Sequence, residues 1–215
     1  DITKTVDGVI TTETVSGDYT LPEASKEGYI ALGWDVDGEL YKVGEVLPAK
    51  LAGYTIKAVN VAFSQLDGAQ VRLSAPSDEK IGGIRFVCRL GSDSLSTHIV
   101  EMGMLVMPTN YMTNGEFTHE NYKSQEKRYR EFVVAKDDME LEVYEQDKTA
   151  NGAQYYYLKG SIVNLYDYNY TRSYSARSFL KVQYHDGVDY LYTDYNEDNN
   201  ERRICDVAKK MIETY

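Results

Sequence analysis

The stretch Gly83-Ile84-Arg85-Phe86-Val87-Cys88-Arg89-Leu90 decides the fold class of this chain. Its residues alternate in polarity, as expected for a strand with one buried and one exposed side. One predicted side carries Ile84, Phe86, Cys88 and Leu90. The other side carries Arg85, Val87 and Arg89. A period of two along the longest patterned segment indicates a protein built mainly from β-strands.

Further strands are predicted on the C-terminal side of this segment. Met102–Pro108 is a dense apolar run and is expected to be a central strand. The remaining predicted strands are Met139–Tyr144, Tyr155–Leu165, Tyr174–Tyr184 and, after a turn at His185-Asp186-Gly187, Val188–Tyr192. Short strands at this spacing favour an antiparallel β-sandwich over parallel β/α units.

One helix is predicted, at the C-terminal end. Asp198 and Glu201 match a capping box. The residues that follow recur at helical spacing and form an apolar stripe of Ile204, Val207, Ala208, Met211, Ile212 and Tyr215. We expect this stripe to cover an open face or edge of the sandwich. Residues 119–131 are too polar and unpatterned for a helix and are predicted to be a long surface loop.

The N-terminal part also has strand patterns. Val9–Val15 is rich in β-branched residues, and Asp37-Gly38 between two apolar runs predicts a two-residue hairpin. A polar, glycine-containing break near 63–70 separates this part from the rest. We therefore predict two domains, residues 1–65 and 69–215.

The N-terminal motifs resemble a known family. Gly28-Tyr29-x-x-x-Gly33-Trp34, then Asp37-Gly38-x-x-Tyr41-x-x-Gly44, then Lys57-Ala58-Val59 are similar to the Listeria–Bacteroides repeat, the B-repeat module of internalin-type proteins. The resemblance covers about residues 8–62. It implies a β-grasp-like fold, a place on secreted or cell-surface bacterial proteins, and no catalysis.

The C-terminal part resembles a second module. An ordered set of motifs, Gly83–Phe86, Met102–Pro108, Tyr170-Thr171-Arg172, Ala176-Arg177-Ser178 and Arg202-Arg203-Ile204, is similar to a β-rich module of large surface proteins of gut Firmicutes. Those proteins often also carry dockerins, B-repeats or glycan-binding modules. The resemblance implies an extracellular location and a polysaccharide-related setting.

Composition excludes several classes of function. The net charge of -11 argues against nucleic acid or an anionic membrane surface as the main partner. No run of about 18 apolar residues exists, so no membrane insertion is expected. The sequence begins at Asp1, as a mature or excised piece does.

Cys88 and Cys205 are expected to be buried free thiols, with a disulfide as the alternative. No catalytic signature occurs, so an enzyme is not expected.

Tyrosine is the main functional clue. There are 20 tyrosines, and they gather after residue 150. Tyr166, Tyr168 and Tyr170 alternate with polar residues and would share one face of an extended strand, where aromatic rings stack on the C–H face of a sugar. The hydrogen-bonding candidates beside them are Asp167, Asn169 and Arg172. Ordinary packing of tyrosines within a sheet is the alternative interpretation.

Two weaker sites complete the candidates. Trp34 with Tyr41 forms a second glycan platform if Trp34 is exposed, and otherwise belongs to the core of the small domain. The side chains of Asp194, Asn196 and Asp198 alternate as hard-cation ligands do, although the spacing is not that of an EF-hand. Calcium is therefore a possible ligand, a solvated loop that caps the helix is the alternative, and no other cofactor is expected.

Two functional hypotheses remain after these exclusions. The first is a non-catalytic glycan-binding module of a secreted bacterial cell-surface protein, whose partner is starch or another polysaccharide or oligosaccharide. The second is a structural spacer, adhesion or protein-docking module whose partners are other modules of a larger surface protein. The tyrosine content favours the first hypothesis, and the B-repeat resemblance favours the second.

Overall fold

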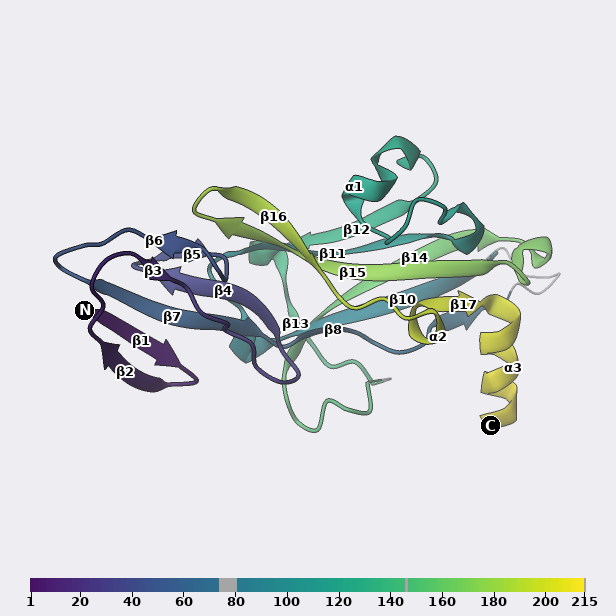
Figure 1. Cartoon of the computed structure of the whole chain (residues 1–215). Helices are drawn as coiled ribbons and strands as arrows, with labels where there is room; N and C mark the ends of the chain where they lie inside the picture. The colour runs from purple at the N-terminus through teal and green to yellow at the C-terminus, as the bar shows by residue number, and fades with distance from the viewer. Residues whose placement is uncertain (74–80, 146, 215) are drawn as a thin grey trace.

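The protein is mainly β, as its sequence predicts, and ends in a short helix (Figure 1). The structure, a computed structural model, describes residues 1–73, 81–145 and 147–214. A five-stranded N-terminal sheet lies at one end of the molecule, and two five-stranded sheets with longer strands face each other as a sandwich beside it. The strand β1 and the helix α3 therefore lie at opposite ends (Figure 1).

The N-terminal part is one mixed sheet with a two-stranded ribbon beside it. Its strands are β1 (Ile2–Val6), β2 (Val9–Glu13), β3 (Tyr19–Thr20), β4 (Ile30–Val36), β5 (Glu39–Tyr41), β6 (Val46–Leu47) and β7 (Tyr54–Val61). The sheet order is β2-β1-β7-β4-β5, in which β1 runs parallel to β7 and the other pairs are antiparallel. The predicted hairpin is confirmed, because Asp37 and Gly38 both have positive φ, at 51° and 97°, between β4 and β5.

The sandwich consists of two antiparallel sheets. The first contains β8 (Phe63–Gln65), β9 (Gln70–Arg72), β10 (Gly82–Gly91), β13 (Leu141–Glu142) and β14 (Tyr155–Leu165). The second contains β11 (Ile99–Pro108), β12 (Arg130–Ala135), β15 (Ser173–Tyr184), β16 (Gly187–Tyr192) and β17 (Glu201–Arg203). The dense apolar strand β11 lies between β12 and β15, which confirms its predicted central place.

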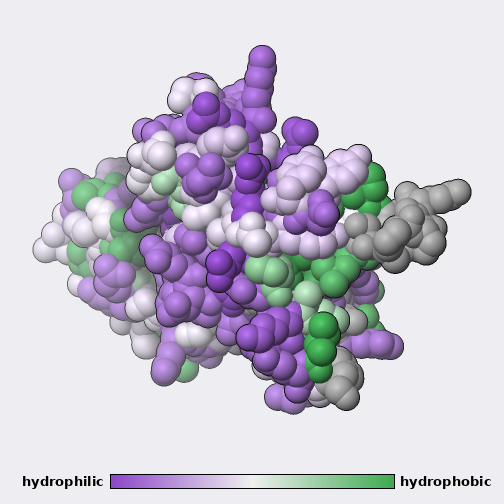
Figure 2. Space-filling view, turned by 90° about the vertical axis from the view of Figure 1, so that its right-hand side faces the viewer, coloured by the Kyte–Doolittle hydropathy of each residue, from purple (hydrophilic) through white to green (hydrophobic). Residues whose placement is uncertain are grey.

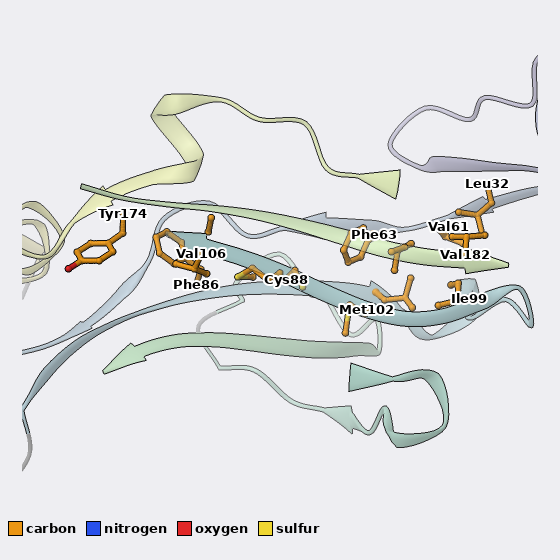
Figure 3. Close-up of a cluster of buried hydrophobic side chains, with 14 of the residues drawn as sticks. Leu32, Val61, Phe63, Phe86, Cys88, Ile99, Met102, Val106, Tyr174 and Val182 are labelled. Carbon is orange, nitrogen blue, oxygen red and sulfur yellow. The ribbon is translucent and has the colours of Figure 1, made fainter. Parts of the chain in front are cut away.

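The core lies between the two sheets and follows the alternation read from β10. Ile84, Phe86, Cys88 and Leu90 are all buried in it, whereas Arg85 is exposed on the opposite face. Figure 3 shows Phe86 and Cys88 in one row with side chains of β11 and β15, from Tyr174 at one end to Leu32 at the other. The row is continuous because strands of period two present every second side chain to the same interior.

The core also crosses into the N-terminal part. β7 and β8 are separated by Ala62 alone, so Val61 and Phe63 contribute to one cluster. The hydroxyl of Tyr184 donates to the carbonyl oxygen of Leu32 at 2.8 Å. We call this contact between the N-terminal sheet and the sandwich the seam. Residues 63–65, which the predicted boundary assigns to the first domain, pair with β10 in the sandwich; the division into two independent domains stays a prediction.

The segment 119–131 is not the open surface loop predicted from its polarity. It contains α1 (His119–Tyr122), a 3₁₀ turn and the beginning of β12. Tyr122 is fully buried and meets Phe117 edge-on, with ring centroids 5.4 Å apart. Together with Leu105, Met107 and Phe179 they form a second layer on the outer face of the sandwich. Polarity counts missed this contact because Tyr122 is the one buried residue within 119–131, among otherwise polar neighbours.

The C-terminal helix differs from its prediction in both start and packing. Asn196 caps the short helix α2 (Glu197–Asn200), and Glu201 then begins β17, so Asp198 and Glu201 form no capping box. α3 (Ile204–Thr214) buries Ile204, whereas Met211 and Ile212 are 47% and 76% exposed. The helix leaves the end of the sheet after β17 (Figure 1). Val207 and Ala208 are half-buried, and Tyr215, the last residue of the predicted stripe, lies outside the described residues.

Candidate functional site

The connection between β14 and β15 carries an exposed aromatic pair. The rings of Tyr166 and Tyr168 are almost parallel, with centroids 5.7 Å apart and an interplanar angle of 10°. The two residues are 50% and 74% exposed. We call Tyr166 and Tyr168 the tyrosine pair. Figure 2 views the molecule from the end that carries α3 and this connection, where hydrophobic and hydrophilic side chains are exposed side by side.

A 3₁₀ turn at Asp167–Asn169 brings the two rings together. The backbone N–H groups of Asn169 and Tyr170 donate to the carbonyl oxygens of Tyr166 and Asp167, each at 2.9 Å. The Asp167 carboxylate accepts from the backbone N–H of Tyr168 at 2.8 Å, which is a local turn contact. The segment is therefore not extended, and the predicted row of three tyrosines on one strand face is wrong.

Tyr170 separates from the pair for the same reason. The turn directs it toward the core, where it packs against the cluster between the two sheets. Its carbonyl oxygen accepts from the backbone N–H of Cys205, which ties the turn to the start of α3. The polar candidates follow or separate the pair along the chain and remain accessible to solvent. Asp167 and Arg172 are exposed, and Asn169 is half-buried.

Trp34 and Tyr41 do not form a glycan platform. Trp34 is 1% exposed and its indole N–H donates to the carbonyl oxygen of Pro22 at 2.8 Å, which confirms the core interpretation. The ring of Tyr41 stacks on His185, with centroids 3.9 Å apart. One face of Tyr41 is therefore covered by the seam, and the Trp34 ring has no face open to a ligand.

A groove of about 1250 Å³ lies on the outer face of the first sandwich sheet. Arg85 and Ser161 form part of its floor, and the guanidinium Nε of Arg85 donates to the Ser161 hydroxyl at 2.8 Å. Tyr144 and Asp147 line it from the segment before β14, and Asn164 lines it near the end of that strand. Asn164 precedes Tyr166 by two residues, so the groove and the tyrosine pair are neighbours along the chain. The backbone of Asn164 has a positive φ of 61°.

The buried carboxylate of Asp147 organises one wall of this groove. It forms an ion pair with Arg89 and accepts hydrogen bonds from the hydroxyls of Thr149 and Tyr157, at 2.8 and 2.9 Å. Burial opposes its ionisation, but these donors outweigh burial and hold the pKa of Asp147 below its ordinary value. Burial and the same carboxylate raise the pKa of Tyr157 to about 12.

Sequence reasoning did not single out these groove residues. Arg85 and Arg89 were recognisable as the polar side of a strand, but nothing in the sequence connects them with Asp147 or Tyr144. The separation of 58 residues between Arg89 and Asp147 shows why: the contact depends on how the segment before β14 folds back over the sheet. A local pattern carries no signal for such a pair.

The calcium candidates are placed around α2. The side-chain oxygen of Asn196 accepts from the backbone N–H of Asp198 at 2.8 Å, as helix N-caps do. Asp194 lines a separate pocket with Glu116, Glu197 and Arg177. Asn196 therefore caps α2 and not the predicted C-terminal helix, and calcium binding by Asp194, Asn196 and Asp198 stays a prediction.

Both cysteines are free, so the alternative of a disulfide is not realised. Cys88 is buried as expected, and burial raises the pKa of its thiol to about 12. Cys205 is only half-buried, because it lies on the first turn of α3 beyond the edge of the core. The raised pKa of the Cys88 thiol is the opposite of the lowered value that marks a reactive cysteine.

Within the described ranges, no helix has the length and apolar character needed to cross a membrane. No family model matches the chain, and comparisons with curated proteins and with solved structures give no match either. The resemblances to the Listeria–Bacteroides repeat and to the Firmicutes surface module therefore stay predictions.

Proposed function

We propose that this chain is a non-catalytic glycan-binding module of a secreted bacterial surface protein, and that the tyrosine pair is its binding platform. The observation that carries the proposal is the exposure of two nearly parallel tyrosine rings at the tip of a structured turn. Most other tyrosines of the chain are buried or half-buried in the described structure, so this pair is unusual in being open to solvent.

The chemistry of the pair suits a sugar ring. A tyrosine ring offers a flat apolar face with only two side-chain torsions to order, so little conformational entropy is lost on binding. The turn hydrogen bonds of Asn169 and Tyr170 already hold the backbone that carries both rings. The exposed guanidinium of Arg172 and the amide of Asn169 supply donors for sugar hydroxyls near these rings.

The neighbouring groove extends the same surface. Its floor is polar at Arg85 and Ser161 and apolar at Val87 and Val163. A polysaccharide chain has this mixed character, because hydroxyl groups surround apolar C–H faces. We infer that a chain held at the tyrosine pair continues past Asn164 into the groove.

The proposal includes no chemical step. A general acid for glycoside cleavage needs a carboxyl group whose pKa lies near the working pH. In the part of the chain that the structure describes, two carboxyl groups, those of Asp67 and Asp147, line the groove. The pKa of Asp147 is shifted in the opposite direction, and its side chain is 2% exposed and paired with Arg89. Asp147 is therefore suited to holding the wall of the groove.

Affinity electrophoresis against starch, xylan, β-glucan and mucin tests the proposal, followed by titration calorimetry with oligosaccharides of any hit. We expect Tyr166→Ala and Tyr168→Ala each to remove most binding and to leave the melting temperature unchanged. Tyr29→Ala, a half-buried tyrosine of the N-terminal part, is the matched control and should bind normally. If no glycan binds at about millimolar concentration, or if Tyr29→Ala weakens binding as much as Tyr168→Ala, the proposal is wrong.

A spacer or docking module is the second candidate. It is favoured by the placement of β1 and α3 at opposite ends of the molecule and by the bonds across the seam, which oppose bending (Figure 1). Such a module would hold other modules of a surface protein apart. A stiff particle in small-angle scattering, together with no binding in the glycan panel, supports this function over the first.

A further inference from the structure

Three potential metal ligands from distant parts of the chain meet at the seam. Glu45 lies between β5 and β6, and His185 and Asp186 form the turn between β15 and β16. One ligand atom from each lies within 4.8 Å of the others, and Nε2 of His185 is 2.7 Å from Oε2 of Glu45. We propose that Glu45, His185 and Asp186 bind one zinc ion, which links the N-terminal sheet to the β15–β16 hairpin.

Two of the three ligands are already held in position. The His185 ring lies almost flat on Tyr41, at an interplanar angle of 13°, and its backbone N–H donates to the carbonyl oxygen of Leu40 at 2.9 Å. The second carboxylate oxygen of Glu45, Oε1, accepts from the backbone N–H of Lys42 at 3.0 Å. These contacts leave His185 Nε2 and Glu45 Oε2 directed toward each other. Ligands oriented in this way lose little freedom when an ion binds.

The ligand types select the ion. Calcium and magnesium prefer oxygen ligands, whereas zinc binds imidazole nitrogen together with carboxylate oxygen. Zinc sites with three protein ligands keep a fourth position for water. Metal–ligand distances of about 2.0–2.2 Å place neighbouring tetrahedral ligands about 3.4 Å apart, which small side-chain rotations achieve here.

Charge and protons balance at this site. The carboxylates of Glu45 and Asp186 offset the two positive charges of the ion. The nearby ammonium of Lys42 is itself paired with Asp189 at 2.7 Å. Zinc binds Nε2 of a neutral imidazole whose one hydrogen is on Nδ1. A hydrogen on Nε2 therefore passes to solvent water, and a ring that started as the neutral Nε2–H tautomer takes up one hydrogen on Nδ1 from solvent water.

A second histidine at the seam supplies a matched control. His98 Nε2 contacts the Asp35 carboxylate at 2.7 Å, across the same seam and in the same His–carboxylate manner. Among the described residues, no third potential ligand joins this pair in a metal-binding group. Replacing His98 therefore removes a comparable seam contact without removing a proposed zinc ligand.

The test is titration calorimetry of zinc chloride into the chelator-treated full chain, with thermal unfolding in zinc and in chelator as a second readout. We expect one zinc per chain, a higher melting temperature in zinc, and at least a tenfold loss of affinity in H185Q and in E45Q. H98Q should bind zinc as the unchanged chain does. Two variants are used so that E45Q decides the question if H185Q does not fold in chelator.

Four results would overturn the proposal. The first is no zinc binding by the unchanged chain at about 100 µM. The second is a folded H185Q or E45Q that binds one zinc with unchanged affinity. The third is an equal loss of affinity in H98Q, which would show that seam integrity rather than ligation is measured. Calcium chloride in place of zinc should give no binding at this site, and saturable calcium binding lost in H185Q would also contradict the assignment to zinc.

Discussion

Gly103→Ala should destabilise the protein, because Gly103 lies directly beneath the ring of Phe179. A Cβ atom added at Gly103 would lie 2.0 Å from Cζ of Phe179 and 2.5 Å from both of its Cε atoms. Carbon atoms make favourable contact only at about 3.5–4.0 Å, so the ring has to move. Phe179 is fully buried, and the rings of His119 and Tyr190 meet it at centroid distances of 4.7 and 5.4 Å. Movement of the ring therefore disturbs the whole outer layer of the second sheet.

The size of the effect follows from two opposing contributions. An extra methyl group in a packed core costs about 1–3 kcal/mol. Replacing a strand glycine by alanine gains about 0.5–1 kcal/mol where the backbone permits it, and Gly103 is not among the glycines with positive φ. We therefore expect Gly103→Ala to lower the free energy of unfolding by about 1–2 kcal/mol, measured by urea denaturation.

A control and a double mutant make this expectation refutable. At Gly160 an added Cβ would lie 2.9 Å from Phe132 Cδ2 and 3.0 Å from Met104 Sδ, and the flexible methionine can yield, so Gly160→Ala should cost less. Phe179→Leu removes the ring edge that the new methyl group meets, so the double mutant should lose clearly less than the sum of the two single losses. Full stability of Gly103→Ala, or simple additivity in the double mutant, would contradict the steric argument.

The remaining predictions concern the helix α3 and the Asp147 network. Ile204→Ala should cost about 2–5 kcal/mol because Ile204 is fully buried, whereas Ile212→Ala should stay within about 0.5 kcal/mol; equal losses in urea denaturation would show that the whole helix docks. The folded pKa of Asp147 lies below its usual 3.8, so this residue contributes stability above pH 4 that is lost as the pH falls through the folded value. Asp147→Asn should lower the free energy of unfolding by up to about 3 kcal/mol at pH 7 and make it less dependent on pH below 4. If the free energy of unfolding of Asp147→Asn falls with acid as steeply as that of the unchanged chain, Asp147 is not a cause of the loss of stability in acid.

The strands themselves were predictable from the sequence. The predicted strand Tyr155–Leu165 coincides with β14, and Tyr174–Tyr184 differs from β15 by one residue. Both are long and contain several tyrosine, phenylalanine, valine or isoleucine residues, which favour strands. The Asp37-Gly38 hairpin was predictable for a related reason, because its positive φ angles are a property of the turn residues.

The candidate sites were predictable only in part. Tyr166, Tyr168, Asp167, Asn169 and Arg172 were recognised by composition, but their arrangement was predicted as an extended strand. The 3₁₀ turn that pairs the two rings follows the positive φ of Asn164, and a backbone hydrogen bond joins its end at Tyr170 to Cys205 of α3. The zinc candidates escaped notice because 140 residues separate Glu45 from His185.

The sequence by itself determined that this protein is mainly β, with sandwich strands, an N-terminal hairpin and a C-terminal amphipathic helix, because periodicity and turn chemistry act over a few residues. Only the tertiary structure decided that Trp34 is buried, that Ile204 is the one fully buried residue in the described part of α3, and that Glu45 meets His185 across the seam. These outcomes depend on which surfaces approach each other after the strands have formed. Burial and long-range contact are properties of the assembled sheets, and a local pattern of residues does not contain them.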